Sequence, residues 1–494
     1  MNELKPLPEE WSGLLNNEQK EAIESIYGPL LIIAGAGSGK TRVLTYRYAH
    51  LIKTYGVNFE NVLAITFTNK AANEMKDRIS DLLNLELSPK WISTFHSLCV
   101  KMLRIHGHLI GFNNNFTIYD QSDSTKLIRN CMRDSDIDTK QYSPKRIQAH
   151  ISSLKNQRIL PGEAIEFAQS FFDVKVAEIY SSYQKKLMLA NSMDFDDLLI
   201  KAVELLETSD KSLNYWSSKF QYIMIDEYQD TNMVQYRLVE LLASKHKNIC
   251  VVGDSDQSIY AFRGADIRNI EEFESDFKDA KVISLEKNYR SSQKILEIAN
   301  AVISNNPRKK DKKLWTDNDE GLDVNLVEFN SERDESRWIA EEIKKLLEDE
   351  AFTEIAIFYR TNNQSRLFEE ELRKLSLNYK VVGNVRFYDR KEIKDILAYL
   401  NYLINPDDTV SFERILNVPK RGIGESTIQK LRDYANKNEI SLSKSIENLD
   451  VINNLSERVK KQINNFKEII NDLKSFALQG PSATISKTLE LTGY

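Results

Sequence analysis

The chain has 494 residues, of which 41% are hydrophobic and 28% are charged, a composition typical of a soluble globular protein with several domains. Lysine and arginine number 67 against 73 acidic residues, and this net charge of −6 excludes a uniformly basic nucleic-acid-binding surface and leaves room only for a local groove. The three cysteines, Cys99, Cys131 and Cys250, lack metal-ligand spacing and predict a reduced cytoplasmic protein, and no apolar run is long enough to span a membrane.

The first predicted elements are a helix, a strand and a glycine-rich loop. The helix has Asn16 as its N-cap and ends at Tyr27, before Gly28 and Pro29. Apolar residues 30–33 then form a short strand, and a new helical pattern begins at its far side. Between them lies the sequence Ala34-Gly35-Ala36-Gly37-Ser38-Gly39-Lys40-Thr41.

This glycine-rich segment has the layout of a phosphate-binding loop. Its glycines let backbone N–H groups face phosphate oxygens, Lys40 would reach the outer phosphates, and the Thr41 hydroxyl would hold Mg²⁺. The strict pattern has glycine where this chain has Ala34, but alanine is the smallest substitute, so we expect the turn to close. The segment predicts binding of a nucleoside triphosphate, and a chance glycine-rich turn is the alternative.

Short apolar runs rich in β-branched residues follow, several of them separated by helical patterns. This alternation predicts an α/β fold with a parallel sheet covered by helices. The expected strands are 62–67, 91–95, 222–225, 249–252 and 282–285. Residues 112–215 interrupt the alternation and predict an inserted helical domain, with helices at 124–132, 144–156, 164–190 and 194–207.

A second series of strands and helices is expected after residue 284. Its strands are expected at 324–329, 355–359 and 379–382, and its helices at 337–348 and 366–375. The basic segment 305–313 is expected to be a surface loop. From Lys391 onward the pattern is helical to the last residue.

Two acidic residues follow the predicted strand 222–225 directly. Four apolar residues that lead into Asp226 and Glu227 are typical of a buried strand that ends at a metal site. Asp226 would hold Mg²⁺ through its water shell, and Glu227 would orient and deprotonate an attacking water. Such a pair alone is more often the start of a solvated loop, but together with a phosphate-binding loop it favours an ATPase.

Six groups of residues occur in an order that resembles the UvrD/PcrA/Rep helicases, superfamily 1 motors that move 3′ to 5′ on single-stranded DNA. The match extends over essentially the whole chain and is far more specific than a phosphate-binding loop. The resemblance implies RecA-like P-loop NTPase folds with parallel sheets covered by helices. The matching residues are Ala34–Thr41, Ala64–Ala72, Thr94–Ser97, Ile225–Asp230, Val252–Ala265 and Asn288–Ser291.

The resemblance also implies a division into domains. The first RecA-like motor domain, which binds ATP, would comprise residues 1–111 and 216–283, with the helical domain 112–215 inserted in it. Residues 284–390 would form the first part of a second RecA-like motor domain, and residues 391–494 a partial helical accessory domain.

Around the nucleotide, the resemblance implies roles for residues outside the loop. Gln19 would read the adenine edge, while Arg42 and Tyr289 would sandwich the adenine ring. Gln257 would sense the γ-phosphate, and Arg290 would be the arginine finger. A surface charge at Arg42 and core packing of Tyr289 are the alternatives. The catalytic set expected from these roles is Lys40, Asp226, Glu227, Gln257 and Arg290.

The resemblance places the single strand on aromatic side chains and polar neighbours. Phe67, Tyr260 and Phe262 match stacking positions, and each has core packing as its alternative. Phe262 stands where the family usually has tryptophan, so we expect weaker stacking there. Thr94, His96, Arg263, Arg360 and Asn362 match positions that contact the DNA backbone.

Near residue 420, two glycines flank an apolar residue ahead of a helix. Gly422 and Gly424, with Lys420 and Arg421 beside them, would make a backbone nest for a phosphate and resemble the duplex contact of the family's accessory domain. A plain turn between helices is an equal alternative.

The expected function is that of an ATP-hydrolysing 3′–5′ DNA helicase or translocase of repair or replication type, using ATP and Mg²⁺. Its expected partners are single-stranded DNA and single/double-strand junctions, and it is expected to be a monomer or weak dimer away from membranes. Nothing in the sequence matches the two further motifs that the family carries after its accessory domain, so we expect a truncated chain that translocates poorly. The alternatives are a motor-dead nucleotide- and DNA-binding fragment without unwinding activity and, disfavoured by family analogy alone, an RNA helicase.

Overall fold

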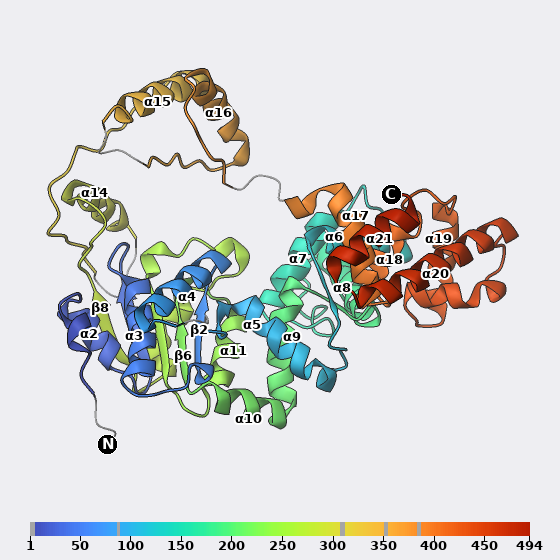
Figure 1. The fold of residues 1–494 in the computed structure, drawn as a ribbon, viewed down its shortest axis with the longest axis horizontal. Helices are drawn as coiled ribbons and strands as arrows, with labels where there is room; N and C mark the ends of the chain where they lie inside the picture. The colour runs from blue at the N-terminus through green and yellow to red at the C-terminus, as the bar shows by residue number, and fades with distance from the viewer. Residues whose placement is uncertain (1–4, 86–88, 307–311, 350–353, 383–386) are drawn as a thin grey trace. The chain divides into compact units, whose positions relative to one another are not determined.

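The computed structural model describes residues 5–85, 89–306, 312–349, 354–382 and 387–494 (Figure 1). The chain forms two compact units, one made of residues 1–321 and 399–494 and the other of residues 322–398. None of the helices in the described ranges combines the length and the apolar character that a membrane span requires.

The larger unit contains a six-stranded sheet in which every neighbouring pair is parallel. The strand order is β3-β2-β6-β7-β1-β8. The strands are β1 Leu30–Ala34, β2 Val62–Thr66, β3 Ile92–Thr94, β6 Tyr222–Ile225, β7 Ile249–Gly253 and β8 Lys281–Leu285. The predicted α/β class is confirmed, and each strand expected in this part of the chain lies within two residues of its predicted bounds.

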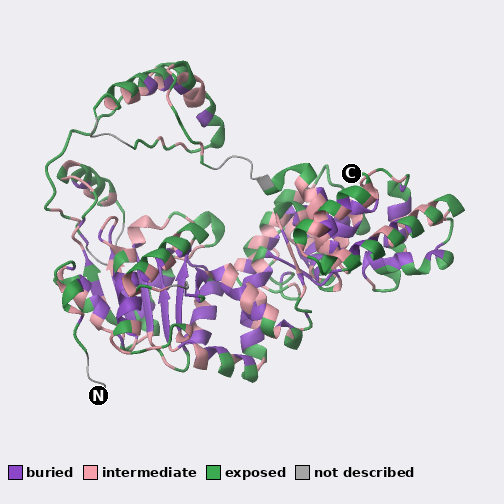
Figure 2. Cartoon of the chain, viewed as in Figure 1, coloured by how far each residue is buried: buried purple, intermediate pink, exposed green. Residues whose placement is uncertain are grey.

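Alternate residues of each strand enter two different cores, because successive side chains point to opposite faces of a sheet. Leu31 and Ile225 pack with helices on one face, while Leu30 and Met224 pack with helices on the other. Helices α5 Phe95–His106, α9 Phe195–Thr208, α10 Asp210–Lys219 and α11 Met233–Ala243 cover the first face. Helices α1 Glu9–Ser12, α2 Asn17–Glu24, α3 Lys40–Lys53 and α4 Asn69–Leu83 cover the second. Figure 2 shows the strands buried between these layers.

Helices dominate the segment inserted between β3 and β6, as expected. They are α6 Gln121–Asp134, α7 Pro144–Asn156 and α8 Phe171–Leu189, together with α9 and α10. The expected helix 164–190 begins later, at Phe171, because the Ser170 side chain accepts a hydrogen bond from the backbone N–H of Asp173 and caps the helix there. A short parallel pair, β4 Thr117–Tyr119 and β5 Ser192–Asp194, was not expected.

A buried charge cluster joins α7 to the start of α9. Lys155 has a fully buried side chain whose Nζ lies 2.7 Å from Asp194 Oδ2 and 2.8 Å from Asp197 Oδ1. The hydroxyl of Tyr183 donates a further hydrogen bond to Asp194. The ammonium group therefore has two carboxylate partners away from water, and each carboxylate depends on it.

The C-terminal helices of the larger unit pack against the inserted segment. The Tyr119 hydroxyl donates to Asp408 Oδ1 at 2.8 Å, and the amide of Asn405 donates to the carbonyls of Ala190 and Asn191. The elements of this region are the part of α17 Lys391–Ile404 from Tyr399 onward, α18 Thr409–Ile415, α19 Glu425–Lys437, the 3₁₀ segment η8 Leu442–Val451, α20 Glu457–Ala477 and α21 Pro481–Thr492. The helical pattern predicted from Lys391 onward is confirmed.

The smaller unit contains helices α15 Glu332–Leu346 and α16 Ser365–Lys374 and the 3₁₀ turns η6 Asn362–Gln364 and η7 Phe387–Asp389. The strands expected at 324–329, 355–359 and 379–382 are wrong, since their described residues form no ladder. Leu326 is 100% exposed and Phe358 94% exposed. A run with β propensity becomes a strand only when another strand supplies hydrogen-bond partners, and the described residues of this unit supply none.

The remaining described elements are short, apart from α14. They are η1 Phe59–Asn61, η2 Gly107–Ile110, η3 Tyr228–Asp230, η4 Ser255–Gln257, η5 Ala261–Arg263, α12 Arg268–Glu271, α13 Phe273–Asp276 and α14 Gln293–Ile303. The expected surface loop 305–313 lies partly outside the described residues. The three cysteines are buried and free, as expected for thiols that fill a core.

Candidate functional site

The carboxyl ends of the central strands bring the predicted chemical residues to one edge of the sheet. In the parallel register, Ile33 lies opposite Gly253, and Ile65 lies opposite Ile225. The glycine-rich loop after β1 and the acidic pair after β6 therefore leave the sheet at the same edge. This edge is where open parallel sheets bind ligands.

The loop after β1 closes as a tight turn in spite of Ala34. This residue is fully buried in the core at the end of β1, so a methyl group is accommodated there. Gly37 and Gly39 have φ angles of +68° and +91°, in the left-handed region that favours glycine. The Ser38 hydroxyl donates to the carbonyl of Gly35 at 2.8 Å. Lys40 and Thr41 then begin helix α3, so the N-terminal end of this helix lies beside the loop.

Gln19 is buried and holds the loop from the side of helix α2. Its amide Nε2 donates to the carbonyl of Ser38 at 3.0 Å, and its Oε1 accepts from the backbone N–H of Asn16. The second contact is half of a capping box with Asn16, which confirms the predicted helix start. The adenine-reading role of Gln19 stays a prediction. The structural role of Gln19 was missed, because its partner Ser38 lies 19 positions along the chain.

The segment after β8 lies against the same loop. Asn288 Nδ2 donates to the carbonyl of Ala36 at 2.6 Å, and the backbone N–H of Tyr289 donates to the carbonyl of Gly37 at 2.9 Å. A Cβ added at Gly37 would lie 2.8 Å from Arg290 Cβ. The predicted arginine finger thus begins beside the phosphate loop, with an exposed side chain. Sequence reasoning missed Asn288 as a site residue, although it opens the Asn-Tyr-Arg-Ser motif.

The two predicted adenine-stacking side chains have other neighbours in this structure. Arg42 is exposed, and its Cζ lies 5.7 Å from the ring centre of Tyr46. Tyr289 is also exposed, with Lys287 Nζ 5.4 Å from its ring centre. Both side chains are accessible to a ligand, and their adenine-binding role stays a prediction.

Lys40 and Thr41 face the two acidic residues after β6. Lys40 Nζ lies 2.6 Å from Glu227 Oε2, and the Thr41 hydroxyl donates to Asp226 Oδ2 at 3.5 Å. Burial and the charge of Glu227 raise the pKa of Asp226 to about 6, while Lys40 opposes the shift. A carboxylate held this far out of water is well suited to a divalent cation.

The residues fit Mg²⁺ bound together with a nucleotide. The described residues contain no group of three or more histidine, cysteine, aspartate and glutamate side chains arranged as a metal cage. Mg²⁺ usually takes one or two protein ligands and completes its shell with phosphate oxygens and water. Thr41 and Asp226, 3.5 Å apart beside the phosphate loop, provide such a pair.

Gln257, the expected γ-phosphate sensor, forms a hydrogen bond with a nearby side chain of the same loop. Its Nε2 donates to Asp254 Oδ2 at 2.6 Å. The other oxygen of Asp254 pairs with Lys312, whose Nζ also lies 3.3 Å from Asp256 Oδ2. In the structure, therefore, Gln257 contacts the end of β7, and its sensing role stays a prediction.

Three predicted stacking residues gather beside the site. The ring centres of Phe67 and Tyr260 lie 4.7 Å apart, and those of Tyr260 and Phe262 lie 6.0 Å apart. Arg263 Cζ lies 5.4 Å from the rings of both Tyr260 and Phe262. Phe262 is 76% exposed, so core packing does not account for it. One exposed and two half-buried aromatic rings beside an arginine form the kind of surface that holds single-stranded nucleic acid.

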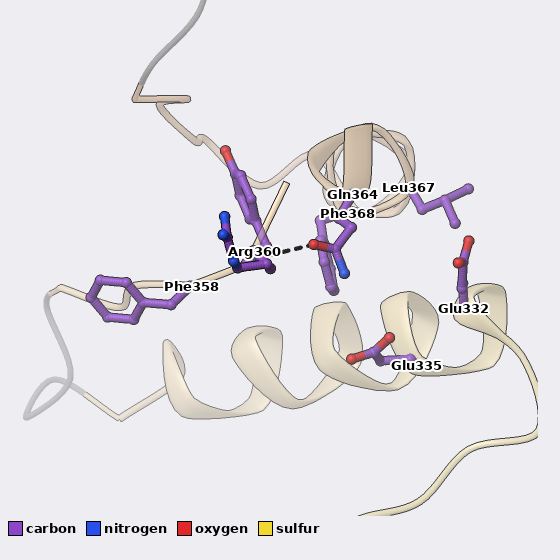
Figure 3. Close-up of a pocket in the computed structure, with 8 residues that line it drawn as sticks. Glu332, Glu335, Phe358, Arg360, Gln364, Leu367 and Phe368 are labelled. Atoms are coloured by element: carbon purple, nitrogen blue, oxygen red, sulfur yellow. Dashed lines mark hydrogen bonds between the residues drawn. The ribbon is translucent and has the colours of Figure 1, made fainter. Parts of the chain in front are cut away.

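The other predicted backbone contacts are divided between several places. Thr94 caps helix α5 by accepting from the N–H of Ser97, and His96 lies edge-on to Phe195 with ring centres 6.0 Å apart. Arg360 belongs to the smaller unit, where it lines a cavity of about 210 Å³ between α15 and α16 (Figure 3). Asn362, the first residue of η6, is exposed in the same unit.

The Gly422–Gly424 turn has the open backbone that a phosphate nest needs. Gly422 has a φ of +75°, and a Cβ added to either glycine would meet nothing within 4 Å. Gly424 is the N-cap of α19. The Arg421 guanidinium, beside this turn, donates to carbonyls at the end of α18 and to the Tyr399 hydroxyl, and the phosphate nest stays a prediction. Lys420 is exposed.

Comparisons with known proteins agree with this geometry. A family model described as the UvrD/REP helicase N-terminal domain matches residues 15–278, and one described as the UvrD-like helicase C-terminal domain matches residues 283–480. The predicted absence of C-terminal motifs is therefore wrong. This second match begins at residue 283, one residue before the position at which the second motor domain was expected to begin.

Several proteins named ATP-dependent DNA helicase PcrA are similar to the chain. Those of Staphylococcus epidermidis and Staphylococcus aureus are 47% identical over 482 residues, which is 97% of this chain and 66% of each relative. The protein of Bacillus subtilis is 48% identical over 461 residues, which is 93% of this chain and 62% of the relative. The chain thus spans slightly less than two thirds of the length of these relatives.

Proposed function

The chain belongs to the UvrD/REP helicase family, and from this premise we propose that it couples ATP hydrolysis to 3′–5′ movement along single-stranded DNA. The relatives are named as ATP-dependent DNA helicases, which supports ATP as the nucleotide and DNA as the nucleic acid. The single observation that carries the proposal is the pairing of Lys40 with Glu227 at the sheet edge that also holds the phosphate loop.

Each residue at this edge of the sheet has a separate role in the proposed hydrolysis. Lys40 and the backbone of the phosphate loop would bind the phosphates, and Thr41 with Asp226 would hold Mg²⁺, which would neutralise charge on the phosphate oxygens. Glu227 accepts the proton of the attacking water. For this, Lys40 must leave Glu227 and turn to a phosphate, which frees the carboxylate. Arg290 supplies positive charge from the segment after β8.

The proposed DNA surface is the group Phe67, Tyr260, Phe262 and Arg263. Bases stack on the rings without sequence readout, and the guanidinium contacts phosphate. Thr94 and His96 extend this contact along the same sheet edge. The exposed Gly422–Gly424 turn is the proposed contact for the duplex side of a junction. We also keep the domain division given above as part of the proposal.

The first test compares the chain with its Glu227→Gln variant in steady-state ATP hydrolysis, with and without oligo-dT. We expect oligo-dT to stimulate hydrolysis by the unchanged chain and the variant to lose at least 100-fold in kcat, since one positioned base contributes about 10²–10⁴. Binding of a non-hydrolysable ATP analogue and of oligo-dT should persist in the variant. Hydrolysis that survives in Glu227→Gln would refute the assigned base.

A second set of conditions separates the neighbouring possibilities. Oligo-U in place of oligo-dT tests an RNA substrate, and equal stimulation by both would remove the preference for DNA. A strand-displacement assay on a duplex with a 3′ single-stranded tail tests unwinding. The same assay is repeated with a 5′ tail. If the chain hydrolyses ATP but unwinds neither duplex, it is a DNA-stimulated ATPase, and the proposed helicase activity is refuted.

A further inference from the structure

Gln229 is a buried side-chain amide between the catalytic carboxylate and the end of β7. It lies in η3 and is 1% exposed. Its Nε2 donates to Glu227 Oε2 at 2.9 Å and to Asp230 Oδ2 at 3.3 Å. Its Oε1 accepts from the backbone N–H of Asp254 at 2.9 Å. One amide therefore joins the proposed catalytic base to the segment that follows β7.

The segment that follows β7 carries the proposed DNA-stacking residues. Ser258 donates through its hydroxyl to the carbonyl of Gln229 at 3.4 Å, and the N–H of Asp266 donates to the carbonyl of Thr231 at 2.9 Å. Tyr260 and Phe262 lie between these two attachment points. A displacement of the stacking rings is thus transmitted to the backbone at 229–231, on which the base depends.

The amide has little freedom to move away from this position. A Cβ added at Gly253 would lie 2.7 Å from Gln229 Oε1, which shows how closely the end of β7 approaches the amide. Glu227 itself has a φ of +52°, a left-handed conformation that is unfavourable for a non-glycine residue and persists only where its surroundings hold it. Gln229 is one of those surroundings.

The proposed movement of Lys40 from Glu227 to a phosphate would change the hydrogen bonds that Glu227 receives. Glu227 Oε2 is shared by Lys40 Nζ and Gln229 Nε2 in this structure. When Lys40 turns to a phosphate, Gln229 is the remaining side-chain donor to that oxygen among the contacts described for Glu227. The amide then determines where the carboxylate points.

We propose that Gln229 is a positioning residue that couples single-strand binding at Tyr260–Arg263 to the orientation of Glu227. This inference rests on the proposed function, since it needs both the base and the DNA surface. In this role Gln229 acts through Glu227 and Asp254, the residues to which its side chain is hydrogen-bonded. Through its hydrogen bonds to Asp254 and Glu227, Gln229 links the position of the DNA-stacking segment to the orientation of the Glu227 carboxylate.

The test replaces Gln229 by methionine, which keeps the length of the side chain and removes its hydrogen bonds to Glu227, Asp230 and Asp254. The matched control is Gln235→Met, because Gln235 is also buried and its amide oxygen accepts a hydrogen bond from the N–H of Asn232 at the start of α11, without contact to Glu227 or Asp254. Both variants and the unchanged chain are assayed for kcat and KM of ATP hydrolysis with and without oligo-dT, for oligo-dT Kd and for Tm. Gln229→Glu is the second variant, because it adds a charge beside Glu227 and Asp230.

We expect Gln229→Met to lose at least tenfold in the ratio of DNA-stimulated to unstimulated kcat, with KM for ATP and Kd for oligo-dT within threefold of the unchanged chain. Gln235→Met should lower Tm and keep the ratio. Gln229→Glu should not restore the ratio, because its carboxylate cannot donate to Glu227. A role in filling space predicts instead that methionine is tolerated and glutamate is not.

Three results would overturn the inference. The ratio could survive in Gln229→Met, or KM, Kd and the ratio could all deteriorate together with a Tm below that of Gln235→Met, which would mark Gln229 as core support. Restoration of the ratio by Gln229→Glu would also contradict the donor role. By contrast, an unchanged chain that shows no stimulation by oligo-dT would overturn the proposed function itself, and the inference with it.

Discussion

Replacing Lys155 by methionine removes a positive partner that two buried carboxylates share. Lys155 Nζ contacts Asp194 and Asp197 at 2.7 and 2.8 Å, and its side chain is fully buried. Methionine fills much the same space, so the change removes charge more than volume. Breaking a buried ion pair by deleting one partner costs about 3–5 kcal/mol. The free energy of unfolding should fall by about this amount, about 3–5 kcal/mol, and Tm should fall with it.

The pH dependence of this loss follows from the carboxylates that are left behind. Burial and the charge of Asp194 raise the pKa of Asp197 to about 6, although Lys155 opposes the shift. Removal of Lys155 therefore moves this pKa further up. A carboxyl whose pKa is raised on folding favours the folded state below its ordinary pKa and loses that contribution as the pH rises through the folded value. The deficit of Lys155→Met should thus be larger at pH 8 than at pH 5.

The assay is urea unfolding at pH 5 and pH 8, followed by circular dichroism. Lys175→Met is the control, because Lys175 pairs with Glu178 on the surface of α8 at 2.7 Å and such a pair contributes less than about 1 kcal/mol. Adding Asp197→Asn to Lys155→Met should recover part of the loss. A deficit below about 1 kcal/mol, or one that is equal at both pH values, would refute the reasoning.

Two further predictions concern the nucleotide site and acid stability. Gly37→Ala should weaken binding of an ATP analogue at least tenfold, since the added Cβ would lie 2.5 Å from Asn288 Nδ2. The control Gly56→Ala has a similar φ of +67° and nothing within 4 Å of its Cβ, so it should leave that affinity unchanged. Equal losses of affinity in both variants would refute the role of the Asn288 contact. Burial lowers the pKa of His50 to about 4 in the folded chain. In the unfolded chain His50 takes up a proton near its ordinary pKa of 6.5, so the free energy of unfolding should fall as the pH drops from 6.5 toward 4. His50→Phe should flatten this fall in urea titrations, and an unchanged slope would contradict the assignment.

The first sheet could be predicted because its strands carry their signal locally. Each is a continuous apolar run, as buried parallel strands are, and the polar residues that matter follow directly at the carboxyl end. Lys40, Thr41, Asp226 and Glu227 were found for this reason. The capping box at Asn16 was also readable, since both of its partners lie within three residues.

What could not be predicted depends on partners that are distant in the sequence. Residues 324–329 have the composition of a strand, but pairing is a property of two segments and not of one. Gln229, Asn288 and Lys155 are ordinary polar residues in the sequence. Their importance comes from contacts 25, 252 and 39 positions away, to Asp254, Ala36 and Asp194, which no local pattern announces.

The contact between Tyr119 and Asp408 has a consequence for synthesis on the ribosome. The two residues are 289 positions apart. At about 5–20 residues per second, the buried hydroxyl of Tyr119 emerges some 15–60 seconds before its carboxylate partner is made. During that interval the inserted helices can assemble their own core, but the surface that later receives Asn405 and Asp408 is open to water and to other chains. The nascent chain is therefore most vulnerable to wrong association in the middle of its own translation.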